Sequence, residues 1–208
     1  MGYKIRFLVI SSFLLLYGCN TSQRNSNRDA SQVTIDKESI PEIQDFSLHQ
    51  AALNGNKQEV LRLLEEGTDI DMKDPDGRTV LMYSSYNGHT EIARECLNRG
   101  AKVNMRDNYG RTSLMFAASG PFPETVKLLL DNQADPNMAD GEEHYTALMY
   151  AAAEGHLEVV KILLAGKADP TLKDVDGDYA ATFALNNGHK EVADLIRSFI
   201  NGQNDPGN

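Results

Sequence analysis

Residues 77–83 read Gly77-Arg78-Thr79-Val80-Leu81-Met82-Tyr83, and the chain carries near-copies of this stretch. One copy occupies residues 110–116 (GRTSLMF), and another, displaced by a one-residue insertion, occupies residues 145–150 (YTALMY). Weaker copies begin at positions 46 and 177. Neighbouring copies therefore lie about 33 residues apart, and a fixed period of this length indicates a stack of repeated helical or mixed units.

A second motif repeats in register with the first. Residues 87–93 (NGHTEIA), 154–160 (EGHLEVV) and 187–193 (NGHKEVA) share a Gly-His pair followed by Glu. Together the two motifs resemble the ankyrin family, with its G-x-T-x-L helix start, G-H-x-E turn, double-leucine second helix and G-A-D-x-N exit. The resemblance covers residues 46 to 199 and implies an all-α ankyrin-repeat solenoid of about five helix-turn-helix repeats with short β-turn finger loops.

Each motif has a physical role in a helical hairpin. A threonine hydroxyl before an apolar run can accept a hydrogen bond from a free amide at a helix start. A glycine can adopt the positive φ at which one helix ends and the chain reverses. These positions hold Thr79, Thr112 and Thr146 before the first helices, and Gly88, Gly155 and Gly188 before the second helices. The second helices carry a wide apolar face, which only a neighbouring repeat can cover.

Three of the units depart from the pattern. In the third repeat Pro121 occupies the glycine position of the turn, and Gln133 stands where the first two repeats have glycine. We therefore expect a turn of different shape there, because proline restricts the backbone. The next loop, residues 140–144, is one residue longer. The fifth repeat has Tyr179 and Ala181 in place of Thr and Leu, as expected of a C-terminal cap whose outer side meets water.

Residues 1–18 are interpreted as a lipoprotein signal peptide. Two basic residues precede an apolar stretch, residues 7–16, that is too short to span a bilayer. The following sequence, residues 16–19 (LYGC), resembles a bacterial lipobox, which implies cleavage before Cys19 and attachment of lipid to it. Tyr17 departs from the small or aliphatic residue usual at that position. A plain secretory peptide and an uncleaved anchor are the alternatives.

The chain divides into four segments in this interpretation. After the signal peptide, residues 19–44 form a lipidated N-terminus and a flexible tether, because a stretch so polar cannot offset its ordering entropy. Part of residues 36–44 is expected to fold onto the first repeat. The ankyrin repeat domain is predicted over residues 45–200, with repeats at about 45–73, 74–106, 107–139, 140–173 and 174–200. Residues 201–208 are predicted to be a disordered tail.

The pattern of chemically reactive residues does not indicate catalysis. Cys96 falls on the apolar side of a predicted helix, where a small buried residue is expected. The resemblance assigns three histidines of the repeated turn to hydrogen bonds between repeats, and only His144, in the inserted loop, is a candidate functional histidine. The Asp-rich loops fail the EF-hand spacing. We therefore expect neither an enzyme nor a protein that needs a metal or cofactor.

The charge and the resemblance together favour a protein partner. The formal net charge is −10, or −12 once the two basic residues of the signal are removed, which disfavours nucleic acid. The resemblance implies that partners bind the concave face formed by the fingers and first helices, and tyrosine and arginine are frequent at binding hot spots. The candidate partner-binding residues are Arg78, Tyr86, Tyr109, Arg111, Tyr145 and His144. We expect a monomer.

The predicted function is that of an envelope lipoprotein that binds a protein partner. Asn20, directly after Cys19, is not the Asp that retains lipoproteins at the inner membrane in enteric bacteria, so an outer-membrane location facing the periplasm is favoured. An inhibitor or immunity protein that occludes a secreted or toxic enzyme is one alternative. An enzyme accessory or hydrolase built on Glu142, Glu143 and His144 is another, and a passive envelope component is a third.

Overall fold

A computed structural model describes residues 47–203 of the chain, and these residues form an all-α fold. Ten helices follow one another in this part: α1 (Ser47–Leu53), α2 (Lys57–Glu65), α3 (Val80–Tyr86), α4 (Thr90–Asn98), α5 (Ser113–Ala118), α6 (Pro123–Asp131), α7 (Ala147–Glu154), α8 (Leu157–Ala165), α9 (Ala180–Asn186) and α10 (Lys190–Gln203). None of these described helices is long and apolar enough to cross a bilayer. The predicted signal peptide, Cys19 and the tether lie outside the described residues.

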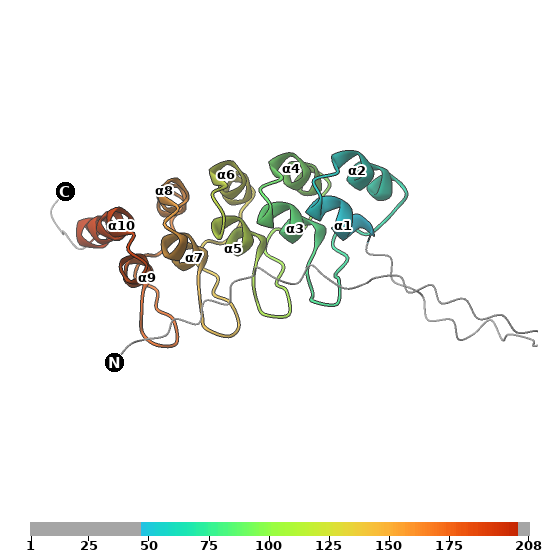
Figure 1. The fold of residues 1–208 in the computed structure, drawn as a ribbon. Coiled ribbons are helices and arrows are strands. Elements are labelled where there is room, and N and C mark those ends of the chain that lie inside the picture. The colour runs from blue at the N-terminus through green and yellow to red at the C-terminus, as the bar shows by residue number, and fades with distance from the viewer. Residues whose placement is uncertain (1–46, 204–208) are drawn as a thin grey trace, which may run out of the picture. The chain divides into compact units, whose positions relative to one another are not determined.

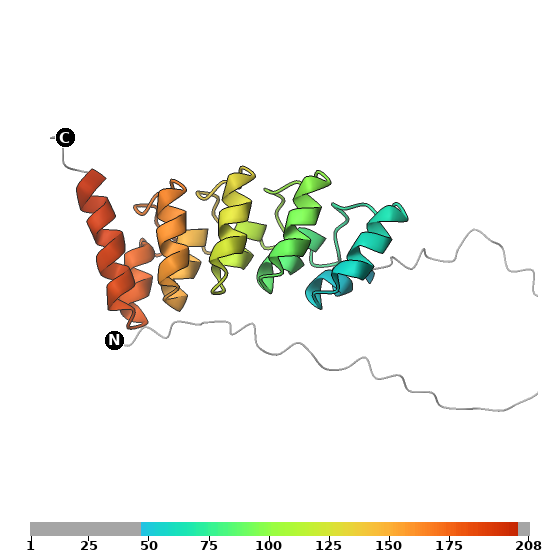
Figure 2. The ribbon, with the colours of Figure 1, turned by 90° about the horizontal axis from the view of Figure 1, so that it is seen from above.

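The helices form five antiparallel pairs stacked side by side, as the repeat pattern predicts. Figure 1 shows α1, α3, α5, α7 and α9 as an inner row, from which the finger loops project to one side. Figure 2 shows the outer row, α2, α4, α6, α8 and α10, with each helix next to that of the neighbouring repeat. Each inner helix contacts its own outer partner and the next inner helix, so every pair buries its apolar face against its neighbours.

Three inner helices begin at a threonine, as predicted. The hydroxyl of Thr79 accepts a hydrogen bond from the Met82 amide at 3.4 Å, and the Met82 sulfur accepts one from the Thr79 amide at 3.5 Å. The same reciprocal pair recurs with residues Thr112, Met115, Thr146 and Met149. The recurrent methionine therefore completes a capping box in addition to filling the core. Tyr179, which begins α9, forms no such side-chain cap.

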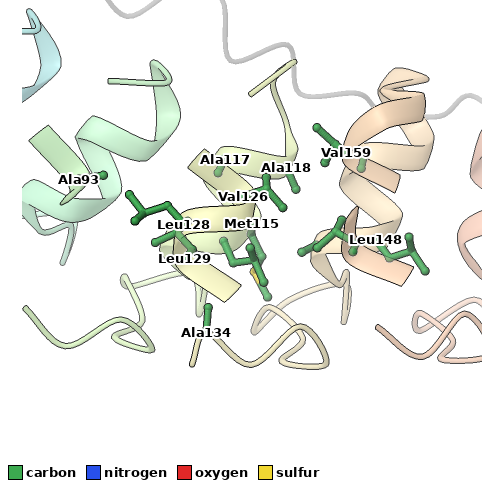
Figure 3. Packing of buried hydrophobic residues seen from close by; sticks show 14 of the residues in the cluster. Ala93, Met115, Ala117, Ala118, Val126, Leu128, Leu129, Ala134, Leu148 and Val159 are labelled. Atoms are coloured by element: carbon green, nitrogen blue, oxygen red, sulfur yellow. The ribbon is translucent and has the colours of Figure 1, made fainter. Parts of the chain in front are cut away.

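The core runs unbroken along the stack, between the two rows of helices. Each of the first four inner helices contributes one leucine that is 1% exposed, namely Leu48, Leu81, Leu114 and Leu148. Figure 3 shows how side chains of the third repeat reach toward Ala93 on one side and Val159 on the other. Cys96 is fully buried at the outer-helix position that is Leu129 in the next repeat. This burial confirms the predicted packing role, and it raises the pKa of the Cys96 thiol to about 12.

The hairpin turns use the predicted glycines, and the following residue packs across the repeat boundary. Gly88 has a φ of 66°, and a Cβ there would lie 2.2 Å from the ring of Phe122 in the next repeat. Phe122 occupies the position of His89, whose Nε2 contacts the carbonyl oxygen of Leu53 at 3.2 Å. His156 makes the equivalent contact, so the predicted structural role holds for these two histidines. The third repeat thus replaces a hydrogen bond with an apolar contact.

The third repeat also has the altered turn that its prolines predict. Helix α5 is one residue shorter than α3, and Pro123 begins α6. At the end of α6, Gln133 adopts a φ of 67°, in the left-handed region that Gly100 occupies one repeat earlier. At the C-terminus, α10 continues to Gln203. Residues 201–203, the first three of the predicted tail, thus belong to this helix, and the rest of that tail lies outside the described residues.

Candidate functional site

An aspartate organises each finger loop from the second repeat to the fifth, and it is buried in all of them except the second, where it is half-buried. In the third finger, the Asp107 amide donates to the Arg111 carbonyl at 2.9 Å, while its Oδ1 accepts from the amides of Tyr109 and Arg111 at 3.0 and 2.8 Å. The same pattern closes the fingers around Asp74 and Asp174, and in the longer fourth finger Asp140 Oδ1 accepts from the amides three and five residues later. One carboxylate oxygen thus fixes the loop backbone, which leaves the second oxygen available for another contact.

The second oxygen is satisfied differently from one repeat to the next. In the second repeat the hydroxyl of Tyr83 donates to Asp74 Oδ2 at 2.6 Å, and in the fourth repeat Tyr150 donates to Asp140 Oδ2 at 3.0 Å. The third repeat has Phe116 at this position, which cannot donate. There Arg111 takes over, with Nε and Nη2 at 2.9 and 2.8 Å from Asp107 Oδ2.

Four of the six predicted partner-binding residues gather around Phe116. The guanidinium carbon of Arg78 lies 5.9 Å from the centre of the Phe116 ring, and that of Arg111 lies 4.8 Å from it. Tyr86 meets the same ring edge-on at 6.1 Å. The Tyr109 ring stacks on Arg111 at 4.8 Å. We refer to Arg78, Tyr86, Tyr109, Arg111 and Phe116 as the Phe116 cluster.

The members of the Phe116 cluster differ in how much of them a partner can reach. Tyr109 is 45% exposed, whereas only 25% of the Arg78 side chain and 14% of the Arg111 side chain are exposed. Both arginines lie beside Asp107, whose side chain is fully buried; Arg78 Nε is 4.0 Å from its Oδ2. The two guanidinium groups are therefore held in place, and a partner that reaches Tyr109 meets a preorganised surface.

Tyr145 belongs to a second aromatic group, separate from the Phe116 cluster. Its ring meets those of Tyr150 and Phe183 edge-on, at 5.9 and 5.1 Å. Burial raises the pKa of Tyr145, and the negative charges of neighbouring carboxylates, Glu143 first and then Asp174, raise it further. Tyr145 stands at the repeat position of Arg78 and Arg111, so an uncharged ring replaces a cation here.

His144 lies apart from both aromatic groups. It is exposed, adopts a φ of 61°, and lines a shallow hollow of about 360 Å³ together with Arg106 and Lys173. Glu142 and Glu143 beside it are also exposed. The structure thus places His144 outside the Phe116 cluster, and it shows no ring contact between His144 and its chain neighbour Tyr145. In residues 47–203, groups of three or more His, Cys, Asp or Glu that could hold a metal ion do not occur.

Successive fingers are joined to one another and change in charge along the array. The Asn108 amide donates to Asp76 O at 3.0 Å, and the Gly141 amide donates to Tyr109 O at 2.8 Å. The second finger (residues 73–78) has two basic and two acidic residues, and the third (106–111) has two basic and one acidic. The fourth (139–145) has three acidic residues and no Lys or Arg, and the fifth (173–178) has three acidic and one basic. The finger row is therefore negative in its C-terminal half.

The sequence pattern alone did not identify Phe116 and Asp107 as the centre of this surface. Phe116 recurs at the same repeat position as Tyr83 and Tyr150, a pattern typical of a core residue, and it is indeed only 7% exposed. The alternation of Tyr with Phe there was the available signal, since only Tyr can donate to the finger aspartate. In the third repeat, which lacks that hydroxyl, Arg111 pairs with the aspartate instead.

Comparison with known proteins agrees with this architecture. The family model described as ankyrin repeats (three copies) matches residues 48–140 and 121–205. No curated protein matches the chain. Ankyrin repeats generally mediate protein–protein interaction and are typically non-enzymatic interaction modules. The matched ranges cover more than half of the chain and include all five helical pairs, and the protein therefore belongs to the ankyrin repeat family.

Proposed function

We propose that this chain is a lipid-anchored envelope protein that binds a protein partner through its finger loops and inner helices, with the Phe116 cluster at the centre of the contact. The anchor in this proposal is lipid on Cys19, and the repeat domain faces the periplasm from the outer membrane. The partner in this proposal is a protein for two reasons. The array presents aromatic and guanidinium groups, which are frequent at protein interfaces. The chain also has a net negative charge, which disfavours nucleic acid.

The main observation behind the proposal is that the Tyr109 ring is exposed and rests on side chains that are themselves held in place. An exposed tyrosine has no role in the core, yet its ring is held by Arg111, which Asp107 holds in turn. Large rings whose position is fixed before binding lose little conformational entropy when a partner arrives. Tyrosine with neighbouring arginine is also the composition that dominates the energetics of protein interfaces.

Capture from envelope extract tests the proposal. Full-length protein, expressed in its own envelope with a C-terminal affinity tag, is expected to retain its partner, and Tyr109→Ala is expected to reduce the amount captured by about tenfold or more. Phe199→Ala is the matched control, because Phe199 is also an exposed ring, at 38%, but lies on the outer helix α10. Equal capture by wild type and Tyr109→Ala would contradict the assignment of the surface.

Separate labelling tests the anchor. Cells grown with radioactive palmitate are expected to label the wild-type chain and to leave Cys19→Ala unlabelled. A wild-type chain that is cleaved but carries no label would show a plain secretory protein.

The acidic C-terminal fingers favour inhibition of a basic enzyme as a second candidate function. Opposite charge speeds the encounter of two proteins, and the fourth and fifth fingers supply three acidic residues each. In the capture experiment, recovery of one stoichiometric secreted hydrolase indicates an inhibitor or immunity protein. Recovery of several envelope proteins indicates an adaptor.

A further inference from the structure

The third finger contains a complete guanidinium site made from the chain's own residues. Asp107 Oδ2 lies within 4.0 Å of two arginines, Arg78 and Arg111, and both guanidinium groups also lie over the ring of Phe116. A buried carboxylate, an aromatic ring and two cations thus form one unit. Pairing a guanidinium with a carboxylate and a ring satisfies its planar donors and uses its weak hydration.

The fifth finger repeats this site without its cations. The Asp174 amide donates to the Asp178 carbonyl at 2.9 Å, and Asp174 Oδ1 accepts from the amides of Asp176 and Asp178 at 3.0 and 2.7 Å. These distances match those around Asp107 to within 0.1 Å. The two loops therefore share one hydrogen-bond pattern, in which Asp174 Oδ2 is the counterpart of Asp107 Oδ2.

At the positions that supply donors to this oxygen in the other fingers, the fifth repeat has residues that do not donate. Phe183 stands where Tyr83 and Tyr150 donate a hydroxyl, Asp178 stands at the position of Arg111, and Tyr145 stands at that of Arg78. In residues 47–203 no side chain or amide donates to Asp174 Oδ2, and this oxygen is not among the buried unpaired atoms, so solvent or a partner can reach it although the residue as a whole is only 9% exposed.

The ring needed to stack on a guanidinium is nevertheless present. Phe183 lies 5.1 Å from Tyr145, as Phe116 lies beside Arg78 in the third repeat. The nearby carboxylates of Glu143 and Asp176 add negative charge around the Tyr145 ring. This corner of the fingers thus has an uncompensated carboxylate, an aromatic ring and a negative potential, the three features that attract an arginine side chain.

We propose that Asp174, Asp178 and the ring of Phe183 form a docking site for an arginine side chain of the protein partner. The partner's guanidinium takes the place that Arg111 takes in the third repeat and donates to Asp174 Oδ2. This inference rests on the proposed function, since it names one chemical feature of the partner. It also predicts binding of a small arginine derivative in the absence of any partner.

The test is a titration of the full chain with Nα-acetyl-arginine amide, followed by NMR of the aromatic rings. The shifts of Phe183 and Tyr145 are expected to move, and the neutral analogue Nα-acetyl-citrulline amide is expected to bind about tenfold more weakly. Equal binding of the citrulline compound overturns the proposal, and so does equal or tighter binding of Nα-acetyl-lysine amide, because an ammonium lacks the planar fork.

Three variants locate the site. Asp174→Asn keeps the Oδ1 acceptor for the loop and is expected to weaken binding about tenfold. Asp140→Asn is the matched control, because Asp140 has the same loop role but its Oδ2 already accepts from Tyr150, and binding should be unchanged. Asp178→Arg supplies the missing guanidinium from the chain itself, and should abolish binding while raising Tm by about 2–4 °C. Unchanged binding in Asp178→Arg overturns the proposal.

Capture from envelope extract separates this inference from the proposed function. Loss of the partner in both Tyr109→Ala and Asp174→Asn supports the two together. Loss in Tyr109→Ala alone retains the proposed function and removes the arginine site. If the wild-type chain captures no protein, the proposed function fails, and the arginine titration still decides whether the site exists.

Discussion

The third and fifth fingers have the same backbone and opposite chemistry. In both loops an aspartate accepts hydrogen bonds from the amides two and four residues later. Around Asp107 two arginines and Phe116 complete the unit, whereas around Asp174 the corresponding residues are Asp178, Tyr145 and Phe183. The comparison shows that the repeat fixes the loop with one carboxylate oxygen and leaves the other oxygen to be satisfied by whatever the local sequence provides.

The different roles of the two carboxylate oxygens explain how the loops keep one backbone pattern while their surfaces differ from repeat to repeat. The backbone contacts of Oδ1 are local, so any finger with Asp at this position can form them. The contacts of Oδ2 come from the ring position of the inner helix and from the end of the finger, where the copies differ. Variation at these two places changes the charge of the surface without changing the loop.

The largest expected effect on stability comes from removing the Phe116 ring, which contacts both arginines. Phe116 is 7% exposed and contacts Arg78, Arg111 and Tyr86, so Phe116→Ala is expected to lower the free energy of unfolding by about 3–4 kcal/mol. Phe183 is only half-buried, and Phe183→Ala should cost about 2 kcal/mol. Urea denaturation followed by circular dichroism measures both. Equal losses would contradict the difference between the third and fifth fingers.

Removing Asp107 should lower the free energy of unfolding more than removing Asp174, by the contribution of one guanidinium contact. Asp107→Ala leaves two amides and Arg111 without their acceptor, with an expected loss of about 2–3 kcal/mol. Asp174→Ala leaves the same two amides but no guanidinium, so the expected loss is about 1–2 kcal/mol. The same denaturation experiment applies. A larger loss at Asp174 would show that its Oδ2 already has a stabilising partner.

Alkaline pH should distinguish fingers closed by tyrosine from those closed by arginine. Burial, the charge of Asp140 and the hydrogen bond to it all raise the pKa of Tyr150 above the ordinary value of 10.0. The contribution of Tyr150 is therefore complete below pH 10 and is lost as pH rises above it, by at most about 1.4 kcal/mol per pH unit. Tyr150→Phe should be less stable than wild type at neutral pH, and this difference should shrink toward about pH 11. A constant difference across the range would contradict the assignment.

The smallest expected effect concerns the end of the outer helix in the third repeat. Gln133 has a φ of 67°, where a side chain is strained and glycine is not. Gln133→Gly is expected to stabilise the protein by about 0.5–1 kcal/mol, seen as a rise in Tm. The reciprocal change, Gly100→Gln, places a side chain at a φ of 90° with open space around it and should lower Tm. If both changes lower Tm, the side chain of Gln133 contributes more than its strain costs.

The sequence by itself determined the repeat, the helix starts and the core. Thr79, Thr112 and Thr146 cap helices where the motif places them, and Cys96 is buried where its helical position requires. These features depend on hydrogen bonds within one turn of helix and on a regular apolar period, so they can be read without the neighbouring repeats. The altered turn of the third repeat was likewise predicted from its prolines.

Only the tertiary structure decided which surface residues act together. Arg78 and Arg111 belong to different fingers and Phe116 belongs to an inner helix, yet both arginines lie beside Asp107 and over the Phe116 ring. Tyr145, at the same repeat position as the arginines, joins Phe183 instead, and His144 lies in a separate hollow. The sequence gives each of these residues a position in the period. Their contacts depend on the offset between stacked repeats, which is set by how the helical pairs pack and is not encoded in any one copy of the motif.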